Sequence, residues 1–227
     1  MGMKQMQHNS LEPGEKIRAE AWLYEQLKRD ILLGVLRPRE RLLENELHER
    51  FQVGRHVVRA ALEALERAGL VERRLNRGAL VRDYTEDEIE ELYDMRKLLH
   101  EAAVERMKFP AKEELIAELE RINSVYRENL EQRNLAEVVD ANDRFHRTLY
   151  ASCGNRSLEQ TIEEFWLKTA AIHCYAIANP ELAQRSLAEH EEMIAAVKAG
   201  DRVWLNKVCN DHMYPALEAY RRANGRW

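Results

Sequence analysis

The sequence lacks the features of an exported, disulfide-bonded or membrane-spanning protein. Its three cysteines, Cys153, Cys174 and Cys209, form no closely spaced pair, so they favour packed, reduced thiols over a disulfide framework or a zinc motif. No stretch approaches the roughly 18 to 20 apolar residues that cross a bilayer, and the opening stretch MGMKQMQHNS is too polar for a signal peptide. We therefore expect a globular, cytoplasmic protein without a membrane partner.

Sequence signatures of common enzyme classes are also missing. The chain contains no glycine-rich phosphate loop, no nucleophile elbow and no HExxH motif. It does have 227 residues with 45% hydrophobic content, which is enough for a real core in one or two domains.

Charge is unevenly distributed between the two halves of the chain. Residues 1–83 carry 16 Lys and Arg against 13 Asp and Glu, whereas residues 84–227 carry 19 against 27. The first half is therefore basic within a protein whose formal net charge is -5. This asymmetry predicts two domains with different partners, and it suggests an anion such as nucleic acid for the first.

The first half has the pattern of a winged helix-turn-helix. Helical periodicity and turn residues predict three helices and a hairpin, over 18–33, 41–51, 55–68 and 70–82. The first helix is expected to bury a stripe made of Trp22, Leu23, Leu27 and Ile31. We therefore predict a DNA-binding domain over 18–83, preceded by a tail over 1–17.

The third predicted helix separates an apolar face from a basic one. Its inward stripe consists of Val58, Ala61, Leu62 and Leu65. Its outward side carries Arg55, His56 and Arg59 near the N-terminus, where guanidinium groups one turn apart can reach guanine edges or phosphates in a major groove. At the tip of the hairpin, Arg77 and Gly78 can reach the neighbouring minor groove. The alternative is a solvated charged face on a small helical bundle.

Longer motifs run through the same residues. The stretch from Tyr24 to Pro38 follows Y-x-x-L-x-x-x-I-L-x-G-x-L-x-P, and L-x-E...V-x-R-x-x-V-R-x-A-L and G-L-V...G-x-x-V come after it. Residues 20–82 therefore resemble the N-terminal domain of the GntR family of bacterial transcription regulators, which implies binding to double-stranded DNA.

Four positions depart from the family pattern: Arg39, Asn45, Gln52 and Gly54. The family usually has glycine at the positions of Arg39 and Gln52, and a capping Ser or Thr at that of Gly54. Asn45 stands where an arginine often contacts DNA. The resemblance therefore places Asn45 at the DNA but does not define the operator sequence.

The second half, 84–227, is predicted to be a bundle of six helices without a strand. Thr85 and Glu88 form a capping box at its start. A second helix is predicted to begin at Pro110, a third to cover 136–151 and a fourth to cover 155–177. The fifth and sixth helices each follow a further cap. These caps are Asn179 with Pro180, and the turn Gly200-Asp201. The predicted fold class is mainly α: a winged helix-turn-helix followed by an all-helical bundle.

Four polar side chains of this half can converge. Asn142 lies within an apolar stripe, and His146 follows it by one turn. His190 precedes the turn at 200–201 by 10 residues and His212 follows it by 11, so two antiparallel helices would bring both to one level. Three imidazoles and an amide oxygen suit a divalent ion with positions left open, although level histidines are also compatible with a structural role.

The same residues carry a second resemblance. The pattern [D/N]-x-x-x-H...H...H occurs here within NDRFH, EHEEM and DHMYP. With it, residues 85–220 resemble the FCD ligand-binding domain of the fatty-acid-regulator-like GntR subfamily, and six helices resemble the vanillate-regulator-like branch. The resemblance implies a site for zinc, nickel or manganese made of Asn142, His146, His190 and His212, with asparagine in place of the commoner aspartate.

Arg96 is unusual because it falls on an apolar stripe, between Leu92 and Leu99. A buried guanidinium requires a partner. That partner is either the carboxylate of a small organic acid or an Asp or Glu of the same domain. His173 is expected to line the pocket or the core, whereas His48, His56 and His100 are not expected to bind metal.

Together these features predict a homodimeric transcription factor, a repressor, that binds a pseudo-palindromic operator and responds to a small organic acid. Dimerisation is expected because one recognition helix covers only a half-site. Two alternatives remain: a metal-dependent enzyme, in which open coordination positions activate water, and a regulator for which the metal itself is the signal.

Overall fold

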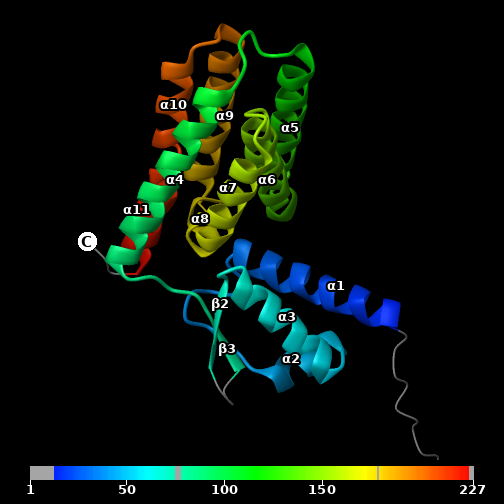
Figure 1. Ribbon diagram of the computed structural model, residues 1–227. Coiled ribbons are helices and arrows are strands. Elements are labelled where there is room, and N and C mark those ends of the chain that lie inside the picture. The colour runs from blue at the N-terminus through cyan, green and yellow to red at the C-terminus, as the bar shows by residue number, and fades with distance from the viewer. Residues whose placement is uncertain (1–12, 75–77, 178, 225–227) are drawn as a thin grey trace, which may run out of the picture.

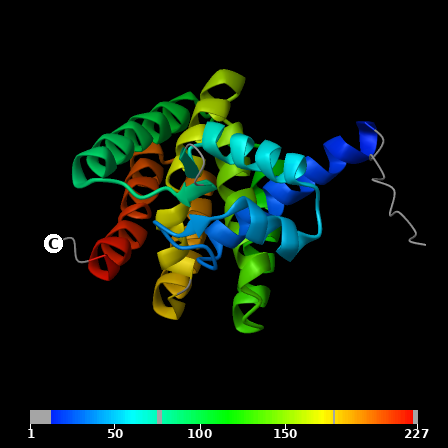
Figure 2. The same ribbon diagram turned by 90° about the horizontal axis from the view of Figure 1, so that it is seen from below.

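The computed structural model describes residues 13–74, 78–177 and 179–224 in two parts (Figure 1). The N-terminal part, called the head here, extends to Val81, and the C-terminal part, called the bundle, begins at Glu86. In the view from below (Figure 2), the blue and cyan helices of the head lie across the green and yellow helices of the bundle. Among the described residues, no helix combines the length and apolar character that a membrane crossing requires.

The head has the architecture predicted for a winged helix-turn-helix. Its elements are α1 (Pro13–Leu32), β1 (Arg41–Leu42), α2 (Glu44–Phe51), α3 (Arg55–Arg67), β2 (Val71–Arg74) and β3 (Gly78–Val81). Strand β3 lies between β1 and β2 and is antiparallel to both. The hairpin β2–β3 is the wing, and α3 is the recognition helix of the motif.

Three details of the head differ from the prediction. The first helix begins at Pro13, so the predicted tail is partly helical. Residues 41 and 42 pair with Leu80 and Ala79 as a strand instead of opening α2. Trp22 was expected in the buried stripe but is 46% exposed, because it lies about 100° around the helix from the buried Leu23. Its ring meets that of Phe51 edge-on.

Two departures from the family pattern fall on left-handed backbone. Arg39 has a φ of 67°, and Gln52, which caps the C-terminus of α2, has a φ of 54°. Glycine adopts this conformation without a steric penalty, which explains the glycine usual in the family. Side-chain contacts help to offset the strain here: Arg39 pairs with Asp83 at 2.5 Å, and the Gln52 amide donates to the Glu49 carbonyl at 2.7 Å.

The described residues of the bundle form eight helices and no strand. They are α4 (Glu86–Arg106), α5 (Glu113–Glu131), α6 (Leu135–Ala151), α7 (Arg156–Lys168), α8 (Ala170–Ile177), α9 (Pro180–Ala199), α10 (Arg202–Asp211) and α11 (Tyr214–Ala223). The predicted capping box of Thr85 and Glu88 is present, and so are the caps at Asn179 and Asp201.

The prediction of six helices was wrong because two of them are each broken once. The run over 155–177 divides at Thr169, whose hydroxyl lies 3.1 Å from the Phe165 carbonyl and competes with the helical backbone. The last run divides between α10 and α11, where Pro215 occupies the first turn and supplies no N–H. The helix count therefore gives no support to the six-helix branch.

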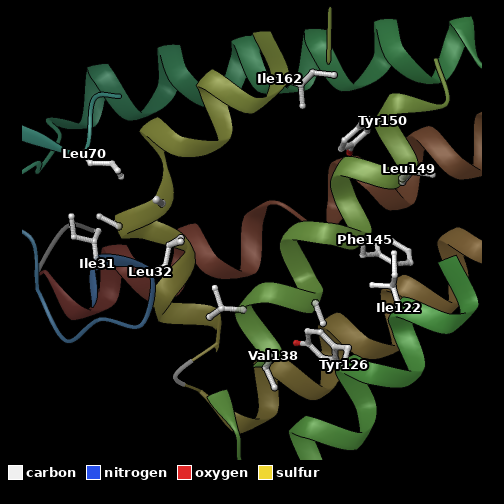
Figure 3. Packing of buried hydrophobic residues seen from close by; sticks show 14 of the residues in the cluster. Ile31, Leu32, Leu70, Ile122, Tyr126, Val138, Phe145, Leu149, Tyr150 and Ile162 are labelled. Atoms are coloured by element: carbon white, nitrogen blue, oxygen red, sulfur yellow. The ribbon is translucent and has the colours of Figure 1, made fainter. Parts of the chain in front are cut away.

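One hydrophobic cluster continues from the head into the bundle. Figure 3 shows Ile31 and Leu70 of the head on one side of the α7–α8 region, and Phe145 and Leu149 of α6 on the other. Helix α1 packs against α8, and α8 packs in turn against α6 and α9. The head is thereby attached to the bundle at α8.

Candidate nucleic-acid interface and metal centre

The recognition helix α3 presents the predicted basic side chains to solvent. Arg55, His56 and Arg59 are exposed in its first turns, whereas the four residues of the predicted inward stripe are buried. Gly54 is the N-cap and contributes no side-chain hydrogen bond. Arg59 Nε donates to Glu44 Oε2 of α2 at 2.9 Å, and this bond raises the pKa of Arg59. A DNA acceptor therefore competes with Glu44 for the Nε of Arg59.

The other predicted DNA contacts differ in what surrounds them. Asn45 is exposed on α2, one residue after the partner of Arg59. Gly78 has a φ of 75°, and a Cβ on it would lie 2.2 Å from the Leu42 carbonyl oxygen. Glycine is thus required there for close packing of β1 on β3, whatever its role at DNA. Arg77 lies outside the described residues.

Three histidines from distant parts of the chain meet inside the bundle. His146 lies on α6, His190 on α9, and His212 is the C-cap of α10. His146 Nε2 is 3.1 Å from His212 Nε2 and 3.3 Å from His190 Nε2. One nitrogen from each ring lies within 4.8 Å of the other two. We predicted that His190 and His212 lie at the same height on the two helices that flank the turn at 200–201, and the structure agrees.

The distances between these nitrogens fit a shared metal ion. Ligand nitrogens bound about 2.1 Å from one ion at tetrahedral or octahedral angles lie roughly 3.0 to 3.4 Å apart. The Nε2 separations from His146 to His212 and to His190 both fall within this range, and the nitrogens of His190 and His212 lie within 4.8 Å of each other. The donor set therefore matches a divalent transition metal in its chemistry and, for two of its three pairs, in its spacing.

The opposite ring nitrogens of two histidines face oxygen acceptors. His212 Nδ1 is 2.7 Å from Glu189 Oε2, and His190 Nδ1 is 3.3 Å from Asn123 Oδ1. A neutral imidazole that donates its Nδ1–H outward directs the lone pair of Nε2 inward. The rings of His212 and His190 are thus held by hydrogen bonds from Nδ1, as the rings of metal-binding histidines usually are.

Burial keeps the central histidines neutral. Burial, reinforced by the nearby His212 and His190, lowers the pKa of His146 well below its ordinary value of 6.5. Burial and His212 lower the pKa of His190 in the same direction. Because the neutral imidazole is the form that binds metal, both rings are available as ligands at neutral pH.

Asn142 lies one turn before His146 on α6 and is buried. It lines a cavity of about 30 Å³ together with Arg96, His173 and His212. Such a volume has room for one or two water molecules. An organic acid can enter only if the surrounding side chains move apart.

Arg96 is buried in the same cavity, with 2% of its surface exposed. Its Nη1 donates to His173 Nε2 at 2.8 Å, and its guanidinium lies 5.2 Å from the ring centres of Tyr93 and Trp166. Within the described chain no carboxylate pairs with Arg96, so the predicted alternative of an internal salt bridge is wrong. Burial lowers the pKa of Arg96, and its Nε has no hydrogen-bond partner in this part of the chain.

The other histidines of the described chain lie outside the cluster of His146, His190 and His212. His173 lines the cavity beside Arg96. His100 is buried and stacks on Tyr150, with ring centres 4.4 Å apart. His48 and His56 belong to the head, and His48 Nδ1 contacts the Val53 carbonyl. None of His48, His56 and His100 joins the three clustered histidines.

Sequence reasoning missed three residues around the histidines. Asn123 and Glu189 accept hydrogen bonds from the rings, and Trp166 packs on His146 with ring centres 4.8 Å apart. Asn123 sits beside Ile122 in the buried face of α5, which is the signal that identified Asn142. Glu189 was detectable only as the neighbour of His190.

Two protein-family models match the chain. The model described as bacterial regulatory proteins, gntR family, matches residues 19–81, and the FCD domain model matches residues 91–214. The FCD match covers more than half of the chain. This chain belongs to the FCD-domain regulators of the GntR family. FCD domains are known to bind metals, and the three histidines of this GntR regulator can hold one.

Curated relatives of this GntR regulator cover most of its length. The HTH-type transcriptional regulator YdhC of Bacillus subtilis is 30% identical over 77% of this chain and 79% of that protein. The gluconate operon transcriptional repressor of Bacillus licheniformis is 29% identical over 78% and 74%, respectively. The HTH-type transcriptional repressor RspR of Escherichia coli is 23% identical over 88% of each chain.

Solved structures share the fold. Escherichia coli McbR/YncC has a TM-score of 0.73 at 19% identity, covering 90% of this chain and 98% of that one. A GntR transcriptional regulator from Rhodococcus sp. RHA1 has a TM-score of 0.73 at 22% identity, covering 94% and 99%. The families and the relatives are transcriptional regulators. This GntR regulator is accordingly a transcriptional regulator and not an enzyme.

Proposed function

We propose that this GntR regulator is a cytoplasmic, homodimeric repressor whose operator binding is controlled by a small organic acid at a metal-containing pocket in the bundle. One observation carries the proposal. Arg96, a buried guanidinium without a carboxylate partner among the described residues, lines the same cavity as His212 of the histidine cluster. A cation on one side and a metal site on the other suit a molecule that carries a carboxylate.

The operator is contacted by the head. Arg55, His56 and Arg59 enter a major groove, supported by Asn45 of α2, and the wing residues Arg77 and Gly78 approach the neighbouring minor groove. The exposure of the α3 side chains and the positive helix N-terminus support this assignment.

In the bundle, zinc, nickel or manganese is held by Asn142, His146, His190 and His212. The ion supplies a positive centre that accepts a carboxylate oxygen in an open coordination position. Arg96 binds the other end of the acid and leaves His173 when it does so. Because the cavity holds no more than about two waters, acid binding separates the helices around it and changes the bundle.

The DNA assignment predicts that Arg55→Ala and Arg59→Ala each weaken operator binding without unfolding the head. Both side chains are exposed, so their removal leaves the core intact, whereas each lost bidentate contact costs about 1 to 3 kcal/mol of specific binding. The measurement is fluorescence anisotropy on DNA from the regulator's own promoter region, beside a thermal melt.

Arg67→Ala is the matched control for this experiment. Arg67 is exposed in the last turn of the same helix, so it removes an equal charge far from the predicted groove contacts. Operator affinity should be nearly unchanged in this variant. Equal affinities for wild type, Arg55→Ala and Arg59→Ala would remove α3 from the interface.

The homodimer is supported by an apolar surface on α4. Met95 is 40% exposed and Leu98 is 59% exposed, and the two residues lie nearly one turn apart on the outer face of α4. Ala102 continues the same face and is exposed as well. Exposed apolar residues in a row on one helix are typical of an interface, and a second copy of the chain is the partner that a two-fold operator requires.

Leu98→Glu is therefore expected to convert the dimer to a monomer and to weaken operator binding at least about tenfold, because a buried unpaired carboxylate is costly and single half-sites bind poorly. Sedimentation equilibrium gives the mass directly. Val35→Glu, at a head residue that is 56% exposed, is the control and should remain dimeric. A wild-type monomer at micromolar concentration contradicts the proposal.

A further inference from the structure

Tyr84 lies between the head and the bundle and is buried. Its hydroxyl donates to the main-chain carbonyl of Lys168 at 2.5 Å and lies 3.3 Å from that of Gly69. Lys168 is the last residue of α7, and Gly69 follows the end of the recognition helix α3. One side chain thus touches the ends of two helices that belong to different domains.

The two helix ends are in direct contact. Gly69 has a φ of 76°, and a Cβ on it would lie 3.0 Å from Lys168 Cγ. In Figure 1, α3 rises toward the bundle and ends below the α7–α8 region. We call this contact between Gly69 and Lys168 the junction. Because glycine lets the end of α3 come this close to α7, a displacement of Lys168 also displaces the end of the recognition helix.

A chain of contacts links the junction to the cavity. Thr169, directly after Lys168, is fully buried, and its hydroxyl lies 3.2 Å from His173 Nε2. The same nitrogen accepts the hydrogen bond from Arg96 Nη1. A ligand that takes Arg96 away from His173 therefore changes the bonding at the residue that separates α7 from α8.

We propose that Tyr84 is the positioning residue that couples the sensor cavity to the recognition helix, by sharing one hydroxyl proton between a carbonyl of the bundle and a carbonyl of the head. The identity of the signal at the cavity rests on the proposed function, but the coupling through Tyr84 does not. Movement of Lys168 relative to Gly69 changes which carbonyl receives the proton, and this changes how the end of α3 is held.

Two properties of the site support this role. Burial raises the pKa of Tyr84, so its hydroxyl stays protonated and remains a donor across the physiological range. Gly69 and Lys168 are both partly shielded from solvent, so whichever carbonyl loses the hydroxyl proton of Tyr84 loses a hydrogen bond that water replaces only in part. The contact is therefore sensitive to small displacements of the junction.

The test is hydrogen exchange by mass spectrometry on the full chain, with zinc ion or with a chelator, in wild type, Tyr84→Phe and Tyr126→Phe. Zinc is expected to change the exchange rate of amides 55–69 about five-fold or more in wild type and less than about two-fold in Tyr84→Phe. Metal content should be equal in the two proteins. Phenylalanine keeps the ring and its packing, so only the hydroxyl contact is removed.

Tyr126→Phe controls for the loss of a buried hydroxyl. Tyr126 donates to the Ala183 carbonyl at 3.1 Å, entirely within the bundle. This variant should respond to zinc as wild type does. A zinc response in Tyr84→Phe equal to that of wild type overturns the proposal. So does a wild-type protein that binds zinc without any change in α3.

If zinc does not bind, the proposed metal site is contradicted but the coupling through Tyr84 is not. A second comparison then tests this coupling. Arg96→Lys perturbs the cavity without metal, because a lysine cannot reproduce the guanidinium bond to His173. Its effect on the exchange of α3 should be present in the wild-type background and absent in Tyr84→Phe. Equal effects in both backgrounds, or no effect in either, overturn the coupling.

Discussion

Replacing His190 by alanine is expected to abolish the stabilisation of the bundle by metal. A ligand that binds only the folded state at 100 to 1,000 times its Kd contributes about 2.7 to 4.1 kcal/mol. For a chain of this size that corresponds to a Tm difference of roughly 5 to 16 °C between metal-loaded and chelated protein. Wild type should show this difference, and His190→Ala should show almost none. Calorimetry measures the Tm of each sample, and elemental analysis measures its metal content.

His100→Ala separates the loss of metal from the loss of packing. Both histidines are buried and stacked on an aromatic ring: His190 on Phe145 at 4.1 Å and His100 on Tyr150 at 4.4 Å. Both alanine variants therefore open a cavity and lower the Tm of the chelated protein. Only His190→Ala should lose the response to metal. Wild-type protein that contains no metal, and gains no stability from zinc, nickel or manganese, reduces the cluster to a structural role.

Local sequence signals predicted several of the element boundaries. The side chains of Thr85, Asn179 and Asp201 each accept a free backbone N–H at a helix start. Pro180 follows Asn179 and has no N–H that needs a partner. These effects are local, so they act wherever the helix is placed. Gly69 ends α3 with a positive φ in the same local way.

The elements that sequence reasoning missed depend on distant partners. Residues 41 and 42 are a strand only because Ala79 and Leu80 are beside them. The break at Thr169 occurs where α7 and α8 pack against different neighbours, namely α4 for α7 and α1, α9 and α11 for α8. Periodicity shows that both segments are helical but not that the axis changes between them.

The candidate metal site was predictable for a geometric reason. His190 and His212 are separated by nearly equal numbers of residues from the turn between two antiparallel helices. Because the rise per residue of a helix is constant, the two side chains lie at nearly the same height along the helix axes. The oxygens of Asn123 and Glu189 were not predictable in the same way, because no sequence interval relates α5 to α9 in space. Coordination by Asn142 stays a prediction, and the structure places Asn142 in the cavity that His212 also lines.

Replacing Arg96 by methionine is expected to leave operator affinity intact and to remove the response to the organic acid, so that the variant behaves as a super-repressor. Methionine fills the space of the side-chain stem but offers no donor to a carboxylate. Arg96 contacts none of the DNA-binding side chains of α3, so the head keeps its contacts with DNA, even though losing the bond to His173 changes the amide exchange of α3 through Tyr84. His146→Ala is expected to act in the same way, by removing the metal anchor. Lys97→Met, at an exposed neighbour on α4, removes an equal charge and should respond as wild type does.

The measurement is calorimetry with a panel of mono- and dicarboxylates, performed on metal-loaded protein with and without operator DNA. An effector that releases DNA must bind the free protein more tightly than the operator complex, and by the same factor the operator must weaken effector binding. Couplings of about 1 to 3 kcal/mol, or roughly 5- to 150-fold, are typical. An acid that binds equally well to metal-free protein and to Arg96→Met contradicts the pocket assignment. Release of DNA by metal alone, without any acid, identifies the ion as the signal instead, because then only the ion has a different affinity for the two states of the dimer.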